Sequence, residues 1–267
     1  KIFCTSIKYY RILDKLPRYV KPIGLGKNVF PSNWIDEKVG ENLSNLNPFY
    51  GELTGIYWLW KNQTTKMKSN DLIGTCHYRK LWLNKIFFKK QKWSTSSLYS
   101  NLLKAETLDK QNVESVQVQP IIFKNKTLLE DFKQIHQTEI LSDSLNFLDG
   151  ENRSLFYKHL NSKKFYPLNM FISRVDIFNK YCQIIFPWLE QCFKLCEEKK
   201  LCVGYNKRLP AFLAERFTSF WFSQYNSKIE LSYARLGKVF LSNKLNYFIN
   251  PIKLPLTFRM YPTLHNY

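Results

Sequence analysis

The sequence predicts an α/β protein with a mostly parallel central sheet flanked by helices. Short apolar runs that suit buried strands alternate with longer segments whose apolar residues recur at helical spacing. No Pro- or Gly-rich linker interrupts this alternation, and a chain of 267 residues with 45% hydrophobic content can bury one large core. We therefore expect residues 1–267 to form a single domain.

Three short segments in the first third of the chain are predicted strands, at residues 1–6, 22–27 and 72–76. The third is continuous and apolar, as expected for a strand that is covered on both faces. Residues 28–48 are rich in Asn, Ser, Gly and Pro and have no period of 2 or 3.6. This stretch is therefore predicted to be an irregular loop.

A helix is predicted directly after this loop. Asn47 is expected to be its N-cap, because the side chain can accept a hydrogen bond from a free backbone N–H, and Pro48 suits the first helical position. The apolar residues that follow give this helix one buried face. They are Leu53, Ile56, Tyr57 and Trp60.

The second half of the chain repeats the order of strand and helix. Thr127 and Glu130 lie three residues apart and predict a capping box at a helix start. Pro187 predicts a kink in the longest helix. The tail, residues 231–267, is aromatic and basic with no clear period. The predicted elements are a weakly patterned helix at 98–106, strands at 116–123 and 166–173, and helices at 127–136, 143–160, 176–199 and 210–225.

The formal charge of +19 calls for an anionic partner, either nucleic acid, an anionic membrane surface or a phosphorylated substrate. The lysines are spread along the chain, and no RNA-binding aromatic motif, zinc finger or helix-turn-helix pattern occurs, which argues against nucleic acid. The alternative that the charge only provides solubility stays open. No run of about 18 uncharged apolar residues and no signal-peptide layout occurs, so we expect a cytoplasmic protein that contacts the inner face of the membrane.

Cysteine and aspartate patterns give little support for a metal site. Most of the six cysteines lie in apolar segments, where free thiols behave as small hydrophobes. The spacing of Cys192, Cys196 and Cys202 lacks the paired knuckle of a zinc site. No D-x-D motif occurs, although many nucleotide-sugar transferases bind a metal through one. No cofactor is firmly implied, and a divalent metal stays open.

The most polar strand end of the sequence follows the predicted strand at 72–76 and consists of His77, Tyr78, Arg79 and Lys80. α/β proteins place their chemistry at the C-terminal ends of buried strands. Arg79 could pair with a diphosphate through its planar fork, and Lys80 as a point charge. His77 could bind a metal, form a hydrogen bond to a donor molecule or hold the turn. The alternative is a strand that merely ends in solvated cations.

Two further segments carry candidate residues. Asn42, Ser44 and Asn47 lead into a helix N-terminus, whose free amides and dipole suit a base, ribose or phosphate. Ordinary loop and capping roles are the alternative. Glu215 lies in a predicted helix, beside a face rich in aromatic side chains, so we expect a raised pKa that suits a general base. A surface Glu paired with Arg216 or Arg208 is the alternative.

Two more polar residues are expected to be structurally constrained. Asn169 interrupts an apolar predicted strand, and a buried amide must find hydrogen-bond partners. His136 lies on a predicted helix, which favours a hydrogen-bonded or exposed histidine. No G-x-G-x-x-G or P-loop pattern occurs, so dinucleotide-binding and kinase-type sites lack support.

Six motifs occur in order over about residues 20–222: Pro-Ile-Gly-Leu-Gly-Lys at 22–27, Gly-Glu-Asn-Leu-Ser at 40–44, Glu-Leu-Thr-Gly-Ile-Tyr-Trp-Leu-Trp-Lys-Asn at 52–62, Ile-Gly-Thr-Cys-His-Tyr-Arg-Lys at 73–80, Leu-Asn-Met-Phe-Ile at 168–172 and Phe-Leu-Ala-Glu-Arg at 212–216. This order resembles that of a family of bacterial capsule and O-antigen synthesis proteins long classified as a domain of unknown function. Two features depart from the pattern of that family: the first strand has Cys-Thr-Ser-Ile at 4–7 in place of a Thr-His-Lys type sequence, and Lys80 replaces a second Arg.

The resemblance implies a GT-A-like transferase that moves galactofuranose from UDP-galactofuranose, with inversion, to an undecaprenyl-diphosphate-linked or other glycan acceptor. Donors such as UDP-galactopyranose or UDP-glucose, and a non-catalytic module that binds a glycan or nucleotide, are the alternatives. The implied roles are catalysis by Glu215 and His77; binding of the donor and its diphosphate by Arg79, Lys80, Tyr78, Asn42, Ser44, Asn47 and Thr5; and contact with the acceptor or sugar by Asn169, Arg216 and His136.

Overall fold

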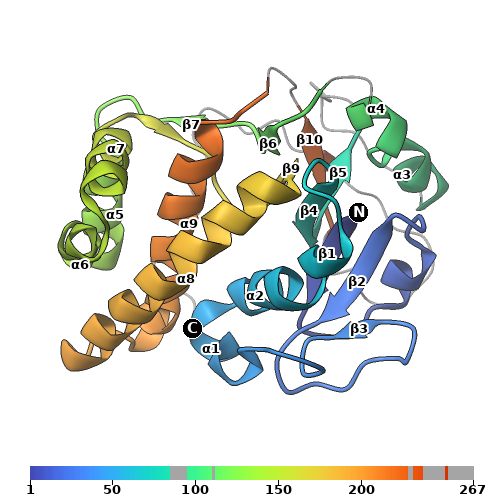
Figure 1. The fold of residues 1–267 in the computed structure, drawn as a ribbon, viewed down its shortest axis with the longest axis horizontal. Helices are drawn as coiled ribbons and strands as arrows, with labels where there is room; N and C mark the ends of the chain where they lie inside the picture. The colour runs from blue at the N-terminus through green and yellow to red at the C-terminus, as the bar shows by residue number, and fades with distance from the viewer. Residues whose placement is uncertain (85–94, 110–111, 228–230, 237–249, 252–267) are drawn as a thin grey trace.

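The computed structural model describes residues 1–84, 95–109, 112–227, 231–236 and 250–251. A nine-stranded sheet runs through these residues, and helices pack against it (Figure 1), which confirms the α/β class. Its strands are β1 (Ile2–Ser6), β2 (Val20–Gly24), β3 (Ile35–Asp36), β4 (Leu72–His77), β5 (Lys80–Leu83), β6 (Ser115–Gln117), β9 (Phe171–Arg174), β10 (Ser232–Arg235) and β11 (Asn250–Pro251).

The strand order is β11-β10-β5-β4-β1-β2-β3, and β4 also pairs with β9, which pairs with β6. The strands β3, β2, β1 and β4 run parallel to one another and form the parallel part of the sheet that the sequence predicts. β5, β9, β6, β10 and β11 add antiparallel pairings on the other side of β4. In the register of β1 and β4, Thr5 lies beside His77, so the two parallel strands end together.

Both faces of the central strands are buried. Phe3 on β1 and Ile73 on β4 belong to one hydrophobic cluster, which α2 and the helices of the second half complete. Cys4 and Cys76 on the same strands belong to a second cluster on the opposite face. Successive side chains of a strand point to opposite faces, so continuous burial requires a cover on each. β4 is therefore covered on both faces, as its continuous apolar sequence predicts, and the six cysteines are free, also as predicted.

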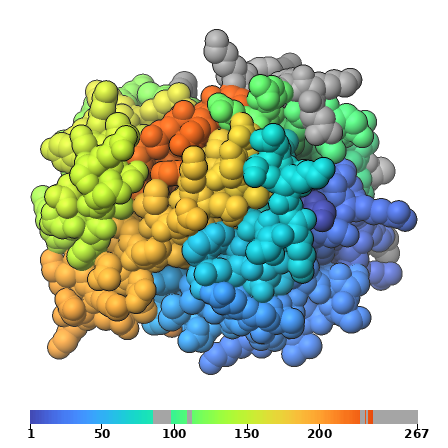
Figure 2. Space-filling model, in the orientation of Figure 1, coloured from blue at the N-terminus to red at the C-terminus, as the bar shows by residue number. Residues whose placement is uncertain are grey.

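Helices lie on both sides of the strands in Figure 1, with α3 and α4 apart from the others. α8 and α9 lie side by side between the sheet and the group formed by α5, α6 and α7, whereas α2 packs beside α8. Figure 2 shows the surfaces of α2 and α8 meeting on one face of the molecule. None of the described helices is long and apolar enough to cross a membrane. The α-helices are α1 (Asn47–Tyr50), α2 (Leu53–Asn62), α3 (Thr95–Asn101), α4 (Ala105–Asp109), α5 (Leu128–His136), α6 (Ile140–Asp143), α7 (Gly150–Leu160), α8 (Val175–Glu198) and α9 (Leu209–Ser223).

Several element predictions are confirmed. Thr127 caps α5, and its hydroxyl accepts a hydrogen bond from the Glu130 backbone while the Glu130 carboxylate accepts one from the Thr127 backbone. α8 and α9 occupy the two long helical segments predicted, and Pro187 lies inside α8. The weakly patterned segment predicted as one helix forms α3 and α4 instead. Most of the tail lies outside the described residues.

The predicted N-cap at Asn47 is wrong. Asn47 is already helical, and the helix breaks at Gly51, whose φ of +56° is a left-handed conformation that favours glycine. The Asn47 side chain instead bridges the break, because its Nδ2 donates to the Gly51 carbonyl at 2.9 Å and to Thr54 Oγ1 at 3.1 Å. The short α1 and the longer α2 replace the single predicted helix.

Three further boundaries differ from prediction for local reasons. The strand predicted at 116–123 breaks at Pro120, which lacks an N–H, and β7 (Ile121–Ile122) pairs with β8 (Lys164–Phe165) in a separate sheet. The strand predicted at 166–173 begins only at Phe171, because Leu168 has a φ of +73°. The helix predicted at 143–160 is divided at Leu148, which is extended, and Asp149 caps α7.

Candidate active site

A cavity of about 410 Å³ opens at the C-terminal ends of β1 and β4. Its walls are the turn after β4, the break between α1 and α2, the loop before β9 and one face of α9. Glu52 and Arg208 also line it, although sequence reasoning did not select Glu52 and gave Arg208 only a pairing role. The predicted site residues that line the cavity are Thr5, Asn47, His77, Tyr78, Arg79, Lys80, Asn169 and Glu215.

His77 is held by the neighbouring parallel strand. The Thr5 hydroxyl donates to the Cys76 carbonyl at 3.2 Å and lies 3.1 Å from His77 Nδ1. Because the single hydroxyl hydrogen is engaged, Thr5 Oγ1 accepts from Nδ1–H, and we assign the hydrogen of the neutral ring to Nδ1. Burial lowers the pKa of His77, an effect that Glu52 only partly opposes. His77 is therefore neutral near pH 7 and presents Nε2 as an acceptor.

Two cations follow His77. Burial lowers the pKa of Lys80 to about 8, although Glu215 and Glu52 act in the opposite direction. Arg79 is exposed, and its guanidinium lies 5.1 Å from the centre of the Tyr78 ring. Tyr78 in turn stacks on Tyr10, with ring centres 5.1 Å apart. This end of β4 thus offers positive charge and an aromatic face to an anionic ligand.

Glu52 is an ionised carboxylate in the cavity wall. Its Oε1 accepts from Asn169 Nδ2 at 2.8 Å, and its Oε2 accepts from Arg208 Nη2 at 2.9 Å. Burial would raise the pKa of Glu52, but three partners outweigh it and hold the pKa below its ordinary value: the His77 ring, which is protonated at the low pH where Glu52 titrates, the Arg208 cation and the Asn169 hydrogen bond. Both carboxylate oxygens therefore have partners, and the charge is retained near neutrality.

Glu215 is the second carboxylate, and its environment has the opposite effect. It lies in the middle of α9, and its Oε1 accepts from the Leu168 N–H at 2.5 Å. Its Oε2 lies 3.4 Å from Arg216 Nη1. Burial raises the pKa of Glu215, and the Arg216 charge and the Leu168 N–H only partly oppose this. Carboxylates whose environments move their pKa values apart are suited to different roles.

Asn169 is hydrogen-bonded to Glu52 and to the protein around it. Its side chain is 1% exposed, its Nδ2 donates to Glu52, and its Oδ1 accepts from the Thr218 hydroxyl at 2.9 Å. Its backbone carbonyl accepts from the Thr75 hydroxyl at 2.9 Å. The buried amide thus has hydrogen-bond partners, as the sequence predicts. Both the nitrogen and the oxygen of the side chain bond to protein, so Asn169 stabilises the wall of the cavity.

Arg216 and His136 do not reach the cavity, so their predicted contacts with sugar or acceptor need correction. Arg216 is fully buried, with Nη2 3.0 Å from Asp131 and the guanidinium 4.0 Å from the centre of the Phe165 ring. His136 is 3% exposed, and its Nδ1 lies 2.8 Å from Asn206 Oδ1. Both side chains are enclosed by protein.

Asn42 and Ser44 also lie outside the cavity lining. The Asn42 side chain donates to the carbonyls of Lys38 and Gly40 and accepts from the backbone and hydroxyl of Ser44. These hydrogen bonds stay within the loop, so Asn42 and Ser44 have the ordinary loop role that was the alternative in the sequence. Of the three candidate residues in this segment, Asn42, Ser44 and Asn47, Asn47 is the one that lines the cavity.

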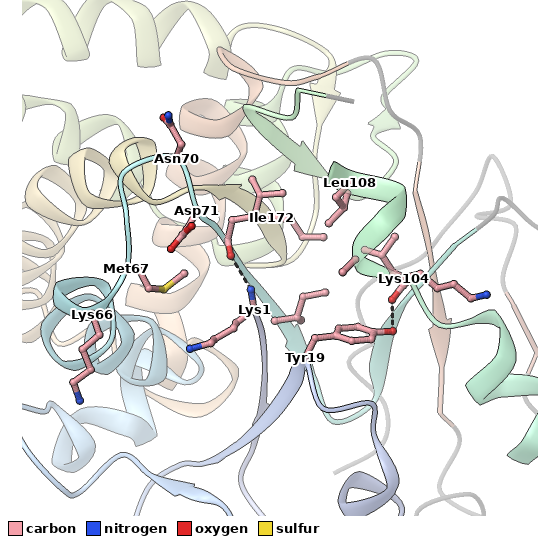
Figure 3. A pocket seen from close by; sticks show the side chains of 13 residues that line it. Lys1, Tyr19, Lys66, Met67, Asn70, Asp71, Lys104, Leu108 and Ile172 are labelled. Atoms are coloured by element: carbon pink, nitrogen blue, oxygen red, sulfur yellow. Dashed lines mark hydrogen bonds between the residues drawn. The ribbon is translucent and has the colours of Figure 1, made fainter. Parts of the chain in front are cut away.

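A second cavity of about 400 Å³ lies at the opposite ends of the same strands, at the start of β1 and β4 (Figure 3). Among the described residues that line it, Asp71 is the one carboxylate, and it accepts from the Lys68 backbone at 2.9 Å. Tyr19 lies at one side of this cavity and donates to the Leu103 carbonyl. The other described lining residues are aliphatic side chains, Met67, Asn70 and lysines, so this lining lacks the paired carboxylates and the histidine of the first cavity.

No group of three or more His, Cys, Asp or Glu in a metal-binding arrangement occurs within the described part of the chain. In the first cavity, His77 Nε2 and the carboxylates of Glu52 and Glu215 are the nearest to metal ligands, and each carboxylate already accepts a hydrogen bond on both of its oxygens. The donor set that the described residues provide is thus weaker than that of a dedicated divalent cation site.

The sheet and its cavity at the carboxyl ends of parallel strands define a protein with a GT-A-like fold. The chain resembles the structure of the WbbM bifunctional glycosyltransferase in its apo form, with a TM-score of 0.66 and 22% sequence identity. That match covers 89% of this chain and 45% of WbbM, so the chain spans less than half the length of the solved protein. Residues 1–227 match the family model of a domain of unknown function, DUF4422, and the chain belongs to this family. No curated protein matches it significantly.

Proposed function

We propose that the chain is a glycosyltransferase that moves a hexose from a UDP-sugar to an acceptor hydroxyl during synthesis of a bacterial surface polysaccharide. The observation that carries the proposal is the cavity itself, where Lys80 and Arg79 adjoin a carboxylate of raised pKa, Glu215. The GT-A-like fold supports the same assignment. We propose UDP-galactofuranose as the donor on the basis of the motif order.

In the proposed reaction, Glu215 removes the proton of the acceptor hydroxyl as that oxygen attacks the anomeric carbon of the donor. The bond between that carbon and the phosphate oxygen breaks, its electron pair leaves with UDP, and attack from the opposite face inverts the anomeric centre. Lys80 and Arg79 offset the charge that develops on the departing diphosphate. His77 accepts a hydrogen bond from the donor through Nε2.

The remaining contacts follow from the cavity lining. Thr5, Asn47 and Tyr78 line the cavity, and in this proposal Thr5 and Asn47 contact the nucleoside while Tyr78 adds an aromatic face. Asn42 and Ser44 lie outside that lining, so the proposed nucleoside site does not include them. A lipid-linked glycan acceptor, and contact of this strongly basic chain with the anionic inner face of the membrane, complete the proposal.

We further propose that protein cations serve the diphosphate without a divalent metal. The sequence has no D-x-D motif, and the strand end where such a motif would stand carries His77 and two cations. Turnover is then expected to survive an excess of EDTA. Loss of turnover that added Mg²⁺ or Mn²⁺ restores would contradict this part of the proposal alone.

The experiment that tests the proposed function is release of UDP from UDP-galactofuranose, with and without a β-galactoside acceptor. Acceptor-dependent release is the expected result, and donor competition by UDP-galactopyranose and UDP-glucose, measured by calorimetry, distinguishes the sugar. Glu215→Gln serves as the inactive control. Donor binding without any release would instead indicate a module that binds nucleotides or glycans without turnover.

A further inference from the structure

Arg208 occupies a place in the cavity wall that only a glycine partner allows. It immediately precedes α9 and lines the cavity together with Ala211, Phe212 and Glu215, which follow it at helical spacing. Its guanidinium lies across the backbone of Gly51. A Cβ built on Gly51 would come within 1.9 Å of Arg208 Nη2, so any larger residue there would displace this cation.

Glu52 holds this guanidinium from one side. Arg208 Nη2 donates to Glu52 Oε2 at 2.9 Å, and the opposite oxygen of Glu52 is fixed by the buried amide of Asn169. The carboxylate is 20% exposed, whereas the Arg208 side chain is 47% exposed. A guanidinium has five N–H donors in a planar fork, so an arginine anchored through one nitrogen keeps donors for a second anion.

The position of Arg208 complements the cations at the end of β4. Arg79 and Lys80 approach the cavity from the turn after β4, whereas Arg208 approaches it from the start of α9. Lys80 is a point charge whose pKa falls to about 8. Arg208 instead offers a planar guanidinium, which can form two parallel hydrogen bonds to one phosphate.

We propose that Arg208 is a further diphosphate-binding residue of this cavity and that Glu52 positions it. The inference rests on the proposed function, because the ligand is the nucleoside diphosphate of the donor. In this proposal Glu52 acts through its hydrogen bond with Arg208 rather than on the ligand, so it is a positioning residue. Arg208 binds the anion in the donor complex and offsets its charge as it leaves.

The test is the affinity of the full chain for UDP and for UMP, measured by calorimetry. Because a hydrogen bond to a charged group contributes about 1.5–3 kcal/mol, Arg208→Ala is expected to weaken UDP binding by about 10- to 100-fold. UMP binding should change less, so the preference for UDP narrows. Arg208→Lys keeps the charge and loses the planar fork, so its affinity for UDP should lie between those of wild type and Arg208→Ala. Lys207→Ala removes the adjacent exposed cation, which does not line the cavity, and should bind UDP like wild type.

The role of Glu52 is tested by a double-mutant cycle. Glu52→Gln is expected to weaken UDP binding in the wild-type background and to have no further effect in Arg208→Ala, because it acts only through that arginine. A merely structural Glu52 would produce additive losses in the two backgrounds. Additive losses would therefore overturn the positioning role.

The outcomes separate this inference from the proposed function. If wild type binds UDP and Arg208→Ala, folded by circular dichroism, binds it within about twofold, the role of Arg208 is wrong while the proposed function stands. If wild type binds neither UDP nor UMP and releases no UDP from the donor, the proposed function is wrong and the inference falls with it.

Discussion

Replacement of Glu215 by Gln probes the proposed base with little change in shape. Gln keeps an oxygen that can accept the Leu168 N–H, now 2.5 Å from Glu215 Oε1. Arg216 loses its contact at 3.4 Å but keeps Asp131 at 3.0 Å. The variant should therefore fold and bind UDP, and only the proton acceptor is removed.

The expected loss in kcat follows from the contribution of a general base, which is about 10²- to 10⁴-fold, or roughly 3–5 kcal/mol in the barrier. The KM for the donor should change little, because Glu215 is assigned to the acceptor. In wild type, burial raises the pKa of Glu215, so activity should fall as the pH drops through that raised value. This acid limb should be absent from the residual activity of the variant.

The thermal stability of Glu215→Gln should not fall with its activity. A carboxyl whose folded pKa is raised stabilises the fold most below its ordinary pKa, and this contribution is lost as the pH rises through the folded pKa. A neutral Gln avoids that loss, so the variant should melt at or above the wild-type temperature at pH 7.5. The assay is acceptor-dependent UDP release beside thermal unfolding of the same samples. A variant that turns over within about tenfold of wild type would refute the base assignment.

Three other substitutions test separate features. Lys80→Arg should carry activity to higher pH, because wild type loses the Lys80 charge as the pH passes about 8, whereas arginine stays charged; an unchanged alkaline limb in the pH profile of UDP release would contradict this. Thr127→Ala should lower the free energy of unfolding by about 1 kcal/mol in a denaturant titration through loss of the capping box, with kcat unaltered. Arg216→Met leaves Asp131 buried with Lys126 as its remaining cation, so unfolding should become easier by about 3–5 kcal/mol; an unchanged denaturant midpoint would argue against this. The donor KM of folded Arg216→Met should match wild type, because Arg216 does not line the cavity.

Local patterns predicted the parts of this protein that local forces determine. The capping box at Thr127 needs only residues three apart, and α8 follows from its apolar spacing. The turn at Leu168 could not be predicted in this way. A leucine with φ of +73° is held by tertiary contacts, among them the hydrogen bond from its N–H to Glu215, 47 residues away.

In the site, too, residues close together in the sequence were predicted, whereas contacts between distant residues were not. His77 and the cations after it were predicted because one strand presents them together. Glu52 was missed because its partner Arg208 lies 156 residues away, although a Gly-Glu pair inside an apolar helical pattern was a usable signal. The misplacement of Arg216 was avoidable, since adjacent helical residues point about 100° apart and Glu215 and Arg216 cannot both face one cavity.

The turn before β9 sets the spacing of the proposed chemistry. The backbone of Leu168 fixes Glu215, and the side chain of the next residue, Asn169, fixes Glu52 and through it Arg208. The proposed proton acceptor, Glu215, and the cation proposed to bind the leaving group, Arg208, are thus both held by two adjacent residues of one turn. A movement of α9 or α2 alone would work against this link, so the acceptor and donor halves of the cavity are expected to shift as one body.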